Sequence, residues 1–137
     1  DALPILDIVI KKSIRKIMRL AIVGTRRFTD YELFLEKLEA NYPLAFDQRY
    51  TEIVSGGAKG TDTLAEQFAE SRGLKMKVYK PDYSKYGRGA PLVRNGQIVE
   101  YADVGVAFID KESRGTKDTI EKFKKAKKKV VVINLSD

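Results

Sequence analysis

The sequence predicts an α/β fold of the Rossmann-like type, a three-layer sandwich around a five-stranded parallel sheet. Short apolar runs alternate along the chain with segments whose apolar residues recur three and four positions apart, as on one face of a helix. Glycine or small polar residues follow most of these runs directly. Alternating strands and helices favour parallel strands, right-handed crossovers and helices on both faces of the sheet.

Five segments are expected to form strands, with four helices between them. The strands are predicted at residues 20–23, 53–54, 76–79, 104–109 and 130–133. A T-x-x-E capping box at Thr29 and Glu32 predicts the start of the first helix, and Gly73 marks the end of the second. A polar, glycine-rich loop from residue 82 to about residue 90 is expected to precede a third helix over residues 92–101.

Residues 18–137 are expected to form one domain, and residues 1–17 an N-terminal extension. The extension has an apolar stretch from Leu3 to Ile10 with basic residues after it, the reverse of the order in a secretory signal. Two interpretations stay open: an amphipathic extension of the domain, or upstream sequence before a natural start at Met18. The apolar stretch is too short to span a bilayer, so no membrane interaction is expected.

The composition excludes several kinds of active site. The chain has no histidine and no cysteine, which rules out a Ser-His-Asp triad, an HExxH zinc site and a cysteine nucleophile. The remaining side chains suit a hard cation, so magnesium is the one cofactor considered. The lack of cysteine fits a reducing compartment, and a cytoplasmic location is expected. Homo-oligomerisation stays open.

The net charge of +7 suits an anionic partner, either a nucleotide or a nucleic acid. Six lysines lie close to the predicted end of the fourth helix, where cations oppose the negative end of the helix dipole. They are Lys122, Lys124, Lys125, Lys127, Lys128 and Lys129. We interpret this cluster as a solvated helix end that adds charge without forming a binding site.

Three turns that follow predicted strands are rich in small and polar residues, at residues 24–27, 55–62 and 110–116. In a parallel sheet they open at the same edge, where ligands of open α/β sheets bind. Glycines let backbone N–H groups approach an anion, and a helix N-terminus favours negative charge. We therefore expect a phosphate-bearing nucleotide or nucleotide derivative there. The expected binding residues are Gly24, Thr25, Arg26, Ser55, Gly56, Gly57, Lys59, Gly60, Thr61, Asp62, Ser113, Gly115 and Thr116.

Plainer interpretations stand beside this one. The glycines of the second turn would also suit a tight turn alone, and Asp62 would suit a helix cap. In the loop before the third helix, Tyr83 and Tyr86 would either stack on a base or cover neighbouring helices, while Arg94 would clamp a phosphate. None of the turns matches the P-loop pattern or G-x-G-x-x-G, which disfavours NTP hydrolysis of that kind and a dehydrogenase.

These turns, together with Arg94-Asn95 and Ala102-Asp103, resemble the SLOG superfamily, in particular its small YspA or YpsA-related branch. The string V-S-G-G-A-K-G-T-D at residues 54–62 is the most specific part of a resemblance that covers about residues 18–133. The superfamily includes the DNA-processing protein DprA (Smf) and the "lonely guy" phosphoribohydrolases. The resemblance implies a Rossmann-like domain that binds nucleotides, and it adds Arg94 and Asn95 to the expected binding residues.

The resemblance also implies two alternatives to binding alone. In the phosphoribohydrolases an arginine before the fourth strand and a glutamate within P-G-G-x-G-T-x-E serve catalysis. Arg94 matches the first, and Asp118 stands in the place of the glutamate in the string E-S-R-G-T-K-D, which lacks the leading P-G-G. Cleavage of the N-glycosidic bond of a nucleoside 5′-monophosphate by Arg94 and Asp118 is one alternative. DprA-like binding of single-stranded DNA is the other.

Overall fold

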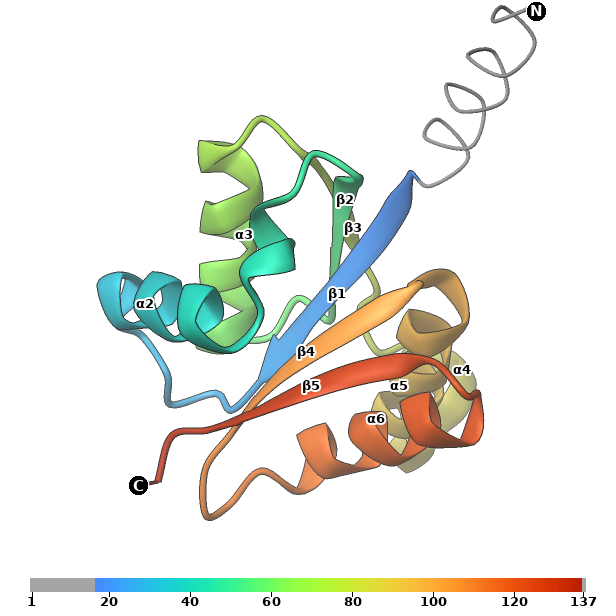
Figure 1. The fold of residues 1–137 in the computed structure, drawn as a ribbon. Helices are drawn as coiled ribbons and strands as arrows, with labels where there is room; N and C mark the ends of the chain where they lie inside the picture. Colours follow the sequence, from blue (N-terminus) through green and yellow to red (C-terminus); the bar gives the residue numbers. More distant parts are fainter. Residues whose placement is uncertain (1–16, 137) are drawn as a thin grey trace, which may run out of the picture.

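The computed structural model describes residues 17–136, so the predicted extension lies outside the described residues except for Ile17. Five parallel strands form one sheet with the order β3-β2-β1-β4-β5, and this confirms the predicted fold class (Figure 1). The strands are β1 (Met18–Gly24), β2 (Tyr50–Ser55), β3 (Lys75–Val78), β4 (Val104–Ile109) and β5 (Lys129–Asn134).

Helices cover both faces of the sheet, as Figure 1 shows. The helices α2 (Tyr31–Asn41) and α3 (Thr61–Ser71) cover one face. The helices α5 (Ala90–Tyr101) and α6 (Arg114–Lys125) cover the other, and the short α4 (Tyr83–Tyr86) precedes α5. The helices α2, α3, α5 and α6 are each held by buried apolar residues, such as Phe34 on α2 and Phe123 on α6.

The residues of β1 and β4 alternate between these two cores, as the period of two in a strand requires. On β1, Leu20 and Ile22 face the core under α2 and α3, while Ala21 and Val23 face the core under α5 and α6. On the α6 side of β4, Gly105 leaves the space that the Phe123 ring occupies, because a Cβ there would lie 2.5 Å from that ring. Small residues therefore let α6 approach the centre of the sheet.

The local signals were wrong at two places. The first helix begins after Asp30, whose carboxylate accepts a hydrogen bond from the Leu33 N–H at 3.1 Å, so Asp30 and not Thr29 is the cap. The expected loop over residues 82–90 contains α4 and a 3₁₀ turn (Gly87–Gly89), because Asp82 caps α4 in the same way. A further 3₁₀ turn, Pro43–Phe46, was not predicted.

The lysine cluster at the end of α6 has a structural role as well as a solvated one. The Lys128 ammonium donates to the carbonyl oxygens of Val99, Glu100 and Ala102, at 2.7, 3.0 and 2.8 Å. These are unpaired carbonyls at the end of α5, where a cation also opposes the helix dipole. Lys128 thus fixes the end of α5 against the start of β5.

The strand order creates a crevice between β1 and β4. These strands are neighbours, yet β1 leads to α2 on one face and β4 leads to α6 on the other. The backbone diverges at such a point. A carboxylate bridges the divergence, because Asp110 after β4 accepts hydrogen bonds from the Thr25 hydroxyl (2.6 Å) and from the Arg27 guanidinium. Within its own turn, Asp110 also accepts from the Ser113 hydroxyl and the Glu112 N–H.

This bridge should make the fold sensitive to acid. Burial raises the pKa of Asp110, but the hydrogen bonds from Thr25, Glu112, Arg27 and Ser113 outweigh it and hold the pKa well below its ordinary value. Such a carboxylate stabilises the fold above its unfolded pKa of about 3.9, and the stabilisation is lost as the pH falls toward the folded pKa. We expect Asp110→Asn to lower the free energy of unfolding by about 1.5–3 kcal/mol at pH 7.

The difference in stability between the wild type and Asp110→Asn should shrink below about pH 4, where Asp110 of the unfolded wild-type chain takes up a proton while the folded carboxylate stays charged. Urea unfolding at pH 7, 5 and 3 measures it. Glu121→Gln is the matched control, since Glu121 forms only an exposed pair with Lys124 and should change stability by less than about 0.5 kcal/mol. A difference of equal size at pH 3 and pH 7 would contradict the role given to the Asp110 charge.

Candidate functional site

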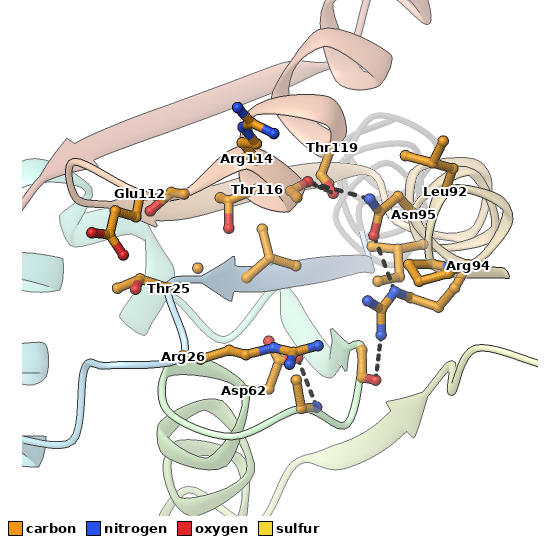
Figure 2. A pocket seen from close by; sticks show the side chains of 18 of the residues that line it. Thr25, Arg26, Asp62, Leu92, Arg94, Asn95, Glu112, Arg114, Thr116 and Thr119 are labelled. Carbon is orange, nitrogen blue, oxygen red and sulfur yellow. Dashed lines mark hydrogen bonds between the residues drawn. The ribbon is translucent and has the colours of Figure 1, made fainter. Parts of the chain in front are cut away.

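A cleft of about 280 Å³ opens at the carboxyl ends of β1 and β4, beside α5 (Figure 2). Residues from all three predicted turns line it, together with residues at the start of α5. Ten of the predicted binding residues line this cleft. They are Gly24, Thr25, Arg26, Gly56, Asp62, Arg94, Asn95, Ser113, Gly115 and Thr116.

The other predicted residues lie outside this cleft. Gly57 and Lys59 line a second hollow that adjoins it. Ser55, Gly60 and Thr61 are buried beneath the turn and line neither hollow. Asp118 lines neither of them, although it lies one turn after Arg114 on α6.

Arg94 reaches into the cleft from α5 and is anchored on both sides. Its Nη1 donates to the carbonyl oxygen of Gly56 at 2.7 Å, and its Nε donates to Oδ1 of Asn95 at 3.0 Å. Burial lowers the pKa of Arg94, the charge of Asp62 raises it, and the like charge of Arg26 lowers it further. Within residues 17–136 no carboxylate lies within 4 Å of either arginine, so their charges are not neutralised by an ion pair.

Two glycines of the second turn make room for these arginines. A Cβ at Gly56 would lie 2.5 Å from Nη1 of Arg94 and 3.1 Å from the Asp62 carboxylate. Gly60 has a φ of +71° and lies against the backbone of Arg26, where a Cβ would overlap the Arg26 carbonyl. The turn is therefore glycine-rich at these two positions because the arginine-bearing segments pack against it.

Asp62 lies at the floor of the cleft and is 6% exposed. Its carboxylate accepts a hydrogen bond from the Ala58 N–H at 3.0 Å, which closes the turn onto the first residues of α3. Burial raises the pKa of Asp62, while the N–H groups of Ala58 and Gly56 and the charge of Arg94 lower it. This contact gives Asp62 the turn-closing role that a residue at a helix start often has.

Most hydroxyl groups predicted to bind a ligand are already hydrogen-bonded within the protein. The Thr25 and Ser113 hydroxyls donate to Asp110, and the Thr61 hydroxyl donates to the Thr25 carbonyl at 2.9 Å. The Ser55 hydroxyl is fully buried and has no hydrogen-bond partner in the described part of the chain. Thr116 differs, since its side chain lines the cleft and its hydroxyl bonds to no other described residue (Figure 2).

The cleft is also lined by residues that were not among the predicted binding residues, and two of them, Arg114 and Leu92, present exposed side chains. Arg114 is exposed at the start of α6 and forms no ion pair with the described residues. Leu92 on the first turn of α5 is 52% exposed. The sequence contained a signal for both residues. Arg114 immediately precedes the predicted binding pair Gly115-Thr116, and Leu92 follows Pro91 at the start of α5, before most of the buried residues of that helix.

Asp118 is held away from the cleft by its own neighbours. Its carboxylate accepts a hydrogen bond from Nδ2 of Asn95 at 3.0 Å and pairs with the Lys122 ammonium. Asn95 also donates to the Gly115 carbonyl at 3.2 Å. Asn95 thus joins Arg94 on α5 to the first turns of α6, and Asp118 is the far end of that chain of contacts.

Among residues 17–136, no group of three or more acidic side chains gathers in the way a bound metal ion would need. None of the helices in this range has the length and apolar character that crossing a membrane requires.

Comparisons with known proteins agree with this fold. The family model described as "YspA, cpYpsA-related SLOG family" matches residues 18–86. The Gene 61 protein of Mycobacterium phage D29 is 32% identical over 91 residues, which cover 62% of this chain and 71% of that protein. DNA processing protein A from Helicobacter pylori, whose structure was studied for its single-stranded DNA binding mode, superposes with a TM-score of 0.63. It is 24% identical and the match covers 88% of this chain and 67% of that one, so this likeness concerns the fold. The chain belongs to the YspA, cpYpsA-related SLOG family.

Proposed function

We propose that this chain binds a nucleotide or a nucleotide-derived ligand in the cleft, with a phosphate group beside Arg26 and Arg94. One observation carries the proposal: two arginines from separate elements line the same cleft, and no carboxylate of residues 17–136 lies within 4 Å of either. Figure 2 shows their guanidinium groups on the same side of the cleft. Like charges held close together repel, and a phosphate between them relieves that repulsion and accepts their hydrogen bonds.

The start of α6 supports binding of an anion. Ser113 occupies the N-cap position, but its hydroxyl bonds to Asp110 instead of capping the helix. The N–H groups of Gly115 and Thr116 consequently have no partner among the described residues. Unpaired N–H groups at a helix start attract anions. The space beside Gly115 is also open, because a Cβ at this position would have no atom of the described residues within 4 Å. A second phosphate oxygen or a ribose hydroxyl would suit this position and the free Thr116 hydroxyl.

Apolar residues on α5 support a ligand that also carries a flat ring. Leu92 is half-exposed at the cleft, next to Pro91, and Ile98 lies behind them. A nucleobase packed on this wall would remove apolar surface from water, which contributes roughly 25 cal/mol for each Å² covered. Cations and an apolar wall that line the same cleft match the two halves of a nucleotide.

Single-stranded DNA is the second candidate ligand. The structural likeness to DNA processing protein A from Helicobacter pylori favours it, as does the net charge of +7. Salt dependence separates the two candidates. Each neutralised phosphate releases counterions, so binding of a long strand weakens steeply with salt, whereas binding of one nucleotide in a cleft weakens little.

A thermal-shift panel of nucleoside monophosphates, dinucleotides and ADP-ribose compounds, with and without magnesium, tests the nucleotide proposal. A ligand at a hundred times its Kd should stabilise the fold by about 2.7 kcal/mol, a visible rise in Tm. Arg94→Ala should weaken that ligand by about 1.5–3 kcal/mol, roughly 10- to 150-fold, because a charge-assisted contact to phosphate is lost.

Arg88→Ala is the matched control for Arg94→Ala. It removes the same charge from an exposed position six residues earlier that lines neither hollow, so affinity should stay within about twofold. The Tm of each variant without ligand separates lost binding from lost folding. A panel that gives no shift at millimolar concentration would contradict nucleotide binding in this cleft.

Asp118→Asn separates binding from catalysis. We expect this variant to retain the wild-type affinity for the ligand, because the Asp118 carboxylate faces Asn95 and Lys122 and does not line the cleft. We also expect no free base from the wild type after long incubation with each nucleoside monophosphate and magnesium, measured by chromatography. Base release that disappears in Asp118→Asn, with binding intact, would instead assign the chain to the phosphoribohydrolases, since a group needed only in the transition state behaves in that way.

A further inference from the structure

A second hollow adjoins the cleft and shares one wall with it. Its volume is about 530 Å³, against about 280 Å³ for the cleft. Gly57, Lys59 and Pro81 belong to the second hollow alone. The residues common to both are Arg26, Gly56, Ala58 and Arg94. The two arginines assigned to phosphate binding therefore stand at the junction of two spaces.

Both arginines keep hydrogen-bond donors free at this junction. The guanidinium of Arg94 uses Nε and Nη1 for Asn95 and Gly56, so Nη2 has no partner among the described residues. Arg26 is exposed and its side chain makes no hydrogen bond to them. A guanidinium carries five N–H donors in a planar fork, which suits the oxygens of a phosphate. A phosphate at the junction would thus be bound from the side of each hollow.

We propose that the ligand is a dinucleotide, two nucleosides joined through phosphate, with the linking phosphate at Arg26 and Arg94 and one nucleoside in each hollow. This inference rests on the proposed function and names its ligand class. At about 280 Å³ the cleft lies at the lower end of the range for small-molecule sites, enough for one nucleoside and its phosphate. The second hollow provides the space for the other.

The surroundings of the second hollow suit a nucleoside. Pro81 gives it an apolar surface, and Tyr83 on α4, two residues further along, does not line the hollow but is 58% exposed. Lys59 adds a cation on the opposite turn. Exposed aromatic rings next to cations are typical of sites where bases stack and phosphates are neutralised. The two hollows share one pair of arginines, which would bind one phosphate linkage. The ligand therefore has two nucleoside units and not a longer chain.

Titration calorimetry with the full chain tests this inference. The probes are each nucleoside 5′-monophosphate, the matching dinucleotides linked by a 5′,5′-pyrophosphate, and oligodeoxynucleotides of two, six and twelve units, each at two salt concentrations. We expect one dinucleotide to bind at least tenfold more tightly than its monophosphate, with one ligand per chain. Affinity should stop rising beyond two units.

Variants show which hollow each nucleoside occupies. Arg26→Ala should weaken the monophosphate and the dinucleotide alike, because Arg26 stands at the junction. Lys59→Ala should weaken dinucleotide binding, and this loss of affinity should be at least threefold larger than the loss for the monophosphate. Lys111→Ala is the control, an exposed lysine that lines neither hollow, and it should leave both affinities unchanged.

Three outcomes would overturn the inference, and they are distinguishable. Equal affinity for monophosphate and dinucleotide would leave the proposed nucleotide site standing and remove the second unit. Affinity that keeps rising to twelve units, with a steep salt dependence, would make the two hollows part of a path for single-stranded DNA. Failure of every probe to bind would overturn the proposed function as well.

Discussion

The carboxylate of Asp110 holds together two loops that the order of the strands directs to opposite faces of the sheet. β1 and β4 are paired, but the helices that follow them cover different faces, and the backbone opens at their carboxyl ends. Hydrogen bonds from Thr25 and Arg27 to Asp110 bridge that opening. The cleft lies beside this bridge, with α5 as its other wall, so the position of the loops around the candidate ligand depends on one charged group.

A small number of contacts also positions the two arginines of the site. Arg94 is held by the Gly56 carbonyl and by Asn95, and Arg26 lies where Gly60 leaves space for its backbone. The Arg94 side chain is already fixed by its two hydrogen bonds, so it loses little conformational entropy when a ligand binds. Its charge, however, is partly buried with no carboxylate of residues 17–136 within 4 Å, which costs stability in the free protein. A site arranged in this way is suited to an anionic group supplied by a ligand.

The polar residues of the three turns divide into those that build the turns and those that face the cleft. Thr25, Thr61 and Ser113 bond to other parts of the chain, whereas Thr116, Arg26 and Arg114 keep free groups at the cleft. All of them lie in short segments rich in Gly, Ser, Thr and Arg, and the neighbouring sequence does not distinguish the two groups. The separation depends on which acceptor the fold brings near each hydroxyl: Asp110, 85 positions from Thr25, accepts from Thr25 and Ser113, and the Thr25 carbonyl accepts from Thr61.

The sequence by itself determined the alternation of strands and helices, the edge of the sheet at which three turns meet, and the absence of imidazole and thiol chemistry. These follow from the periodicity and identity of neighbouring residues, which are properties of each segment. Only the tertiary structure decided that Gly56 accepts a hydrogen bond from Arg94 and that Asp118 accepts one from Asn95. These two contacts join helices and turns that the order β3-β2-β1-β4-β5 brings side by side, and a hydrogen-bonding group bonds to whichever partner the packing places within about 3 Å.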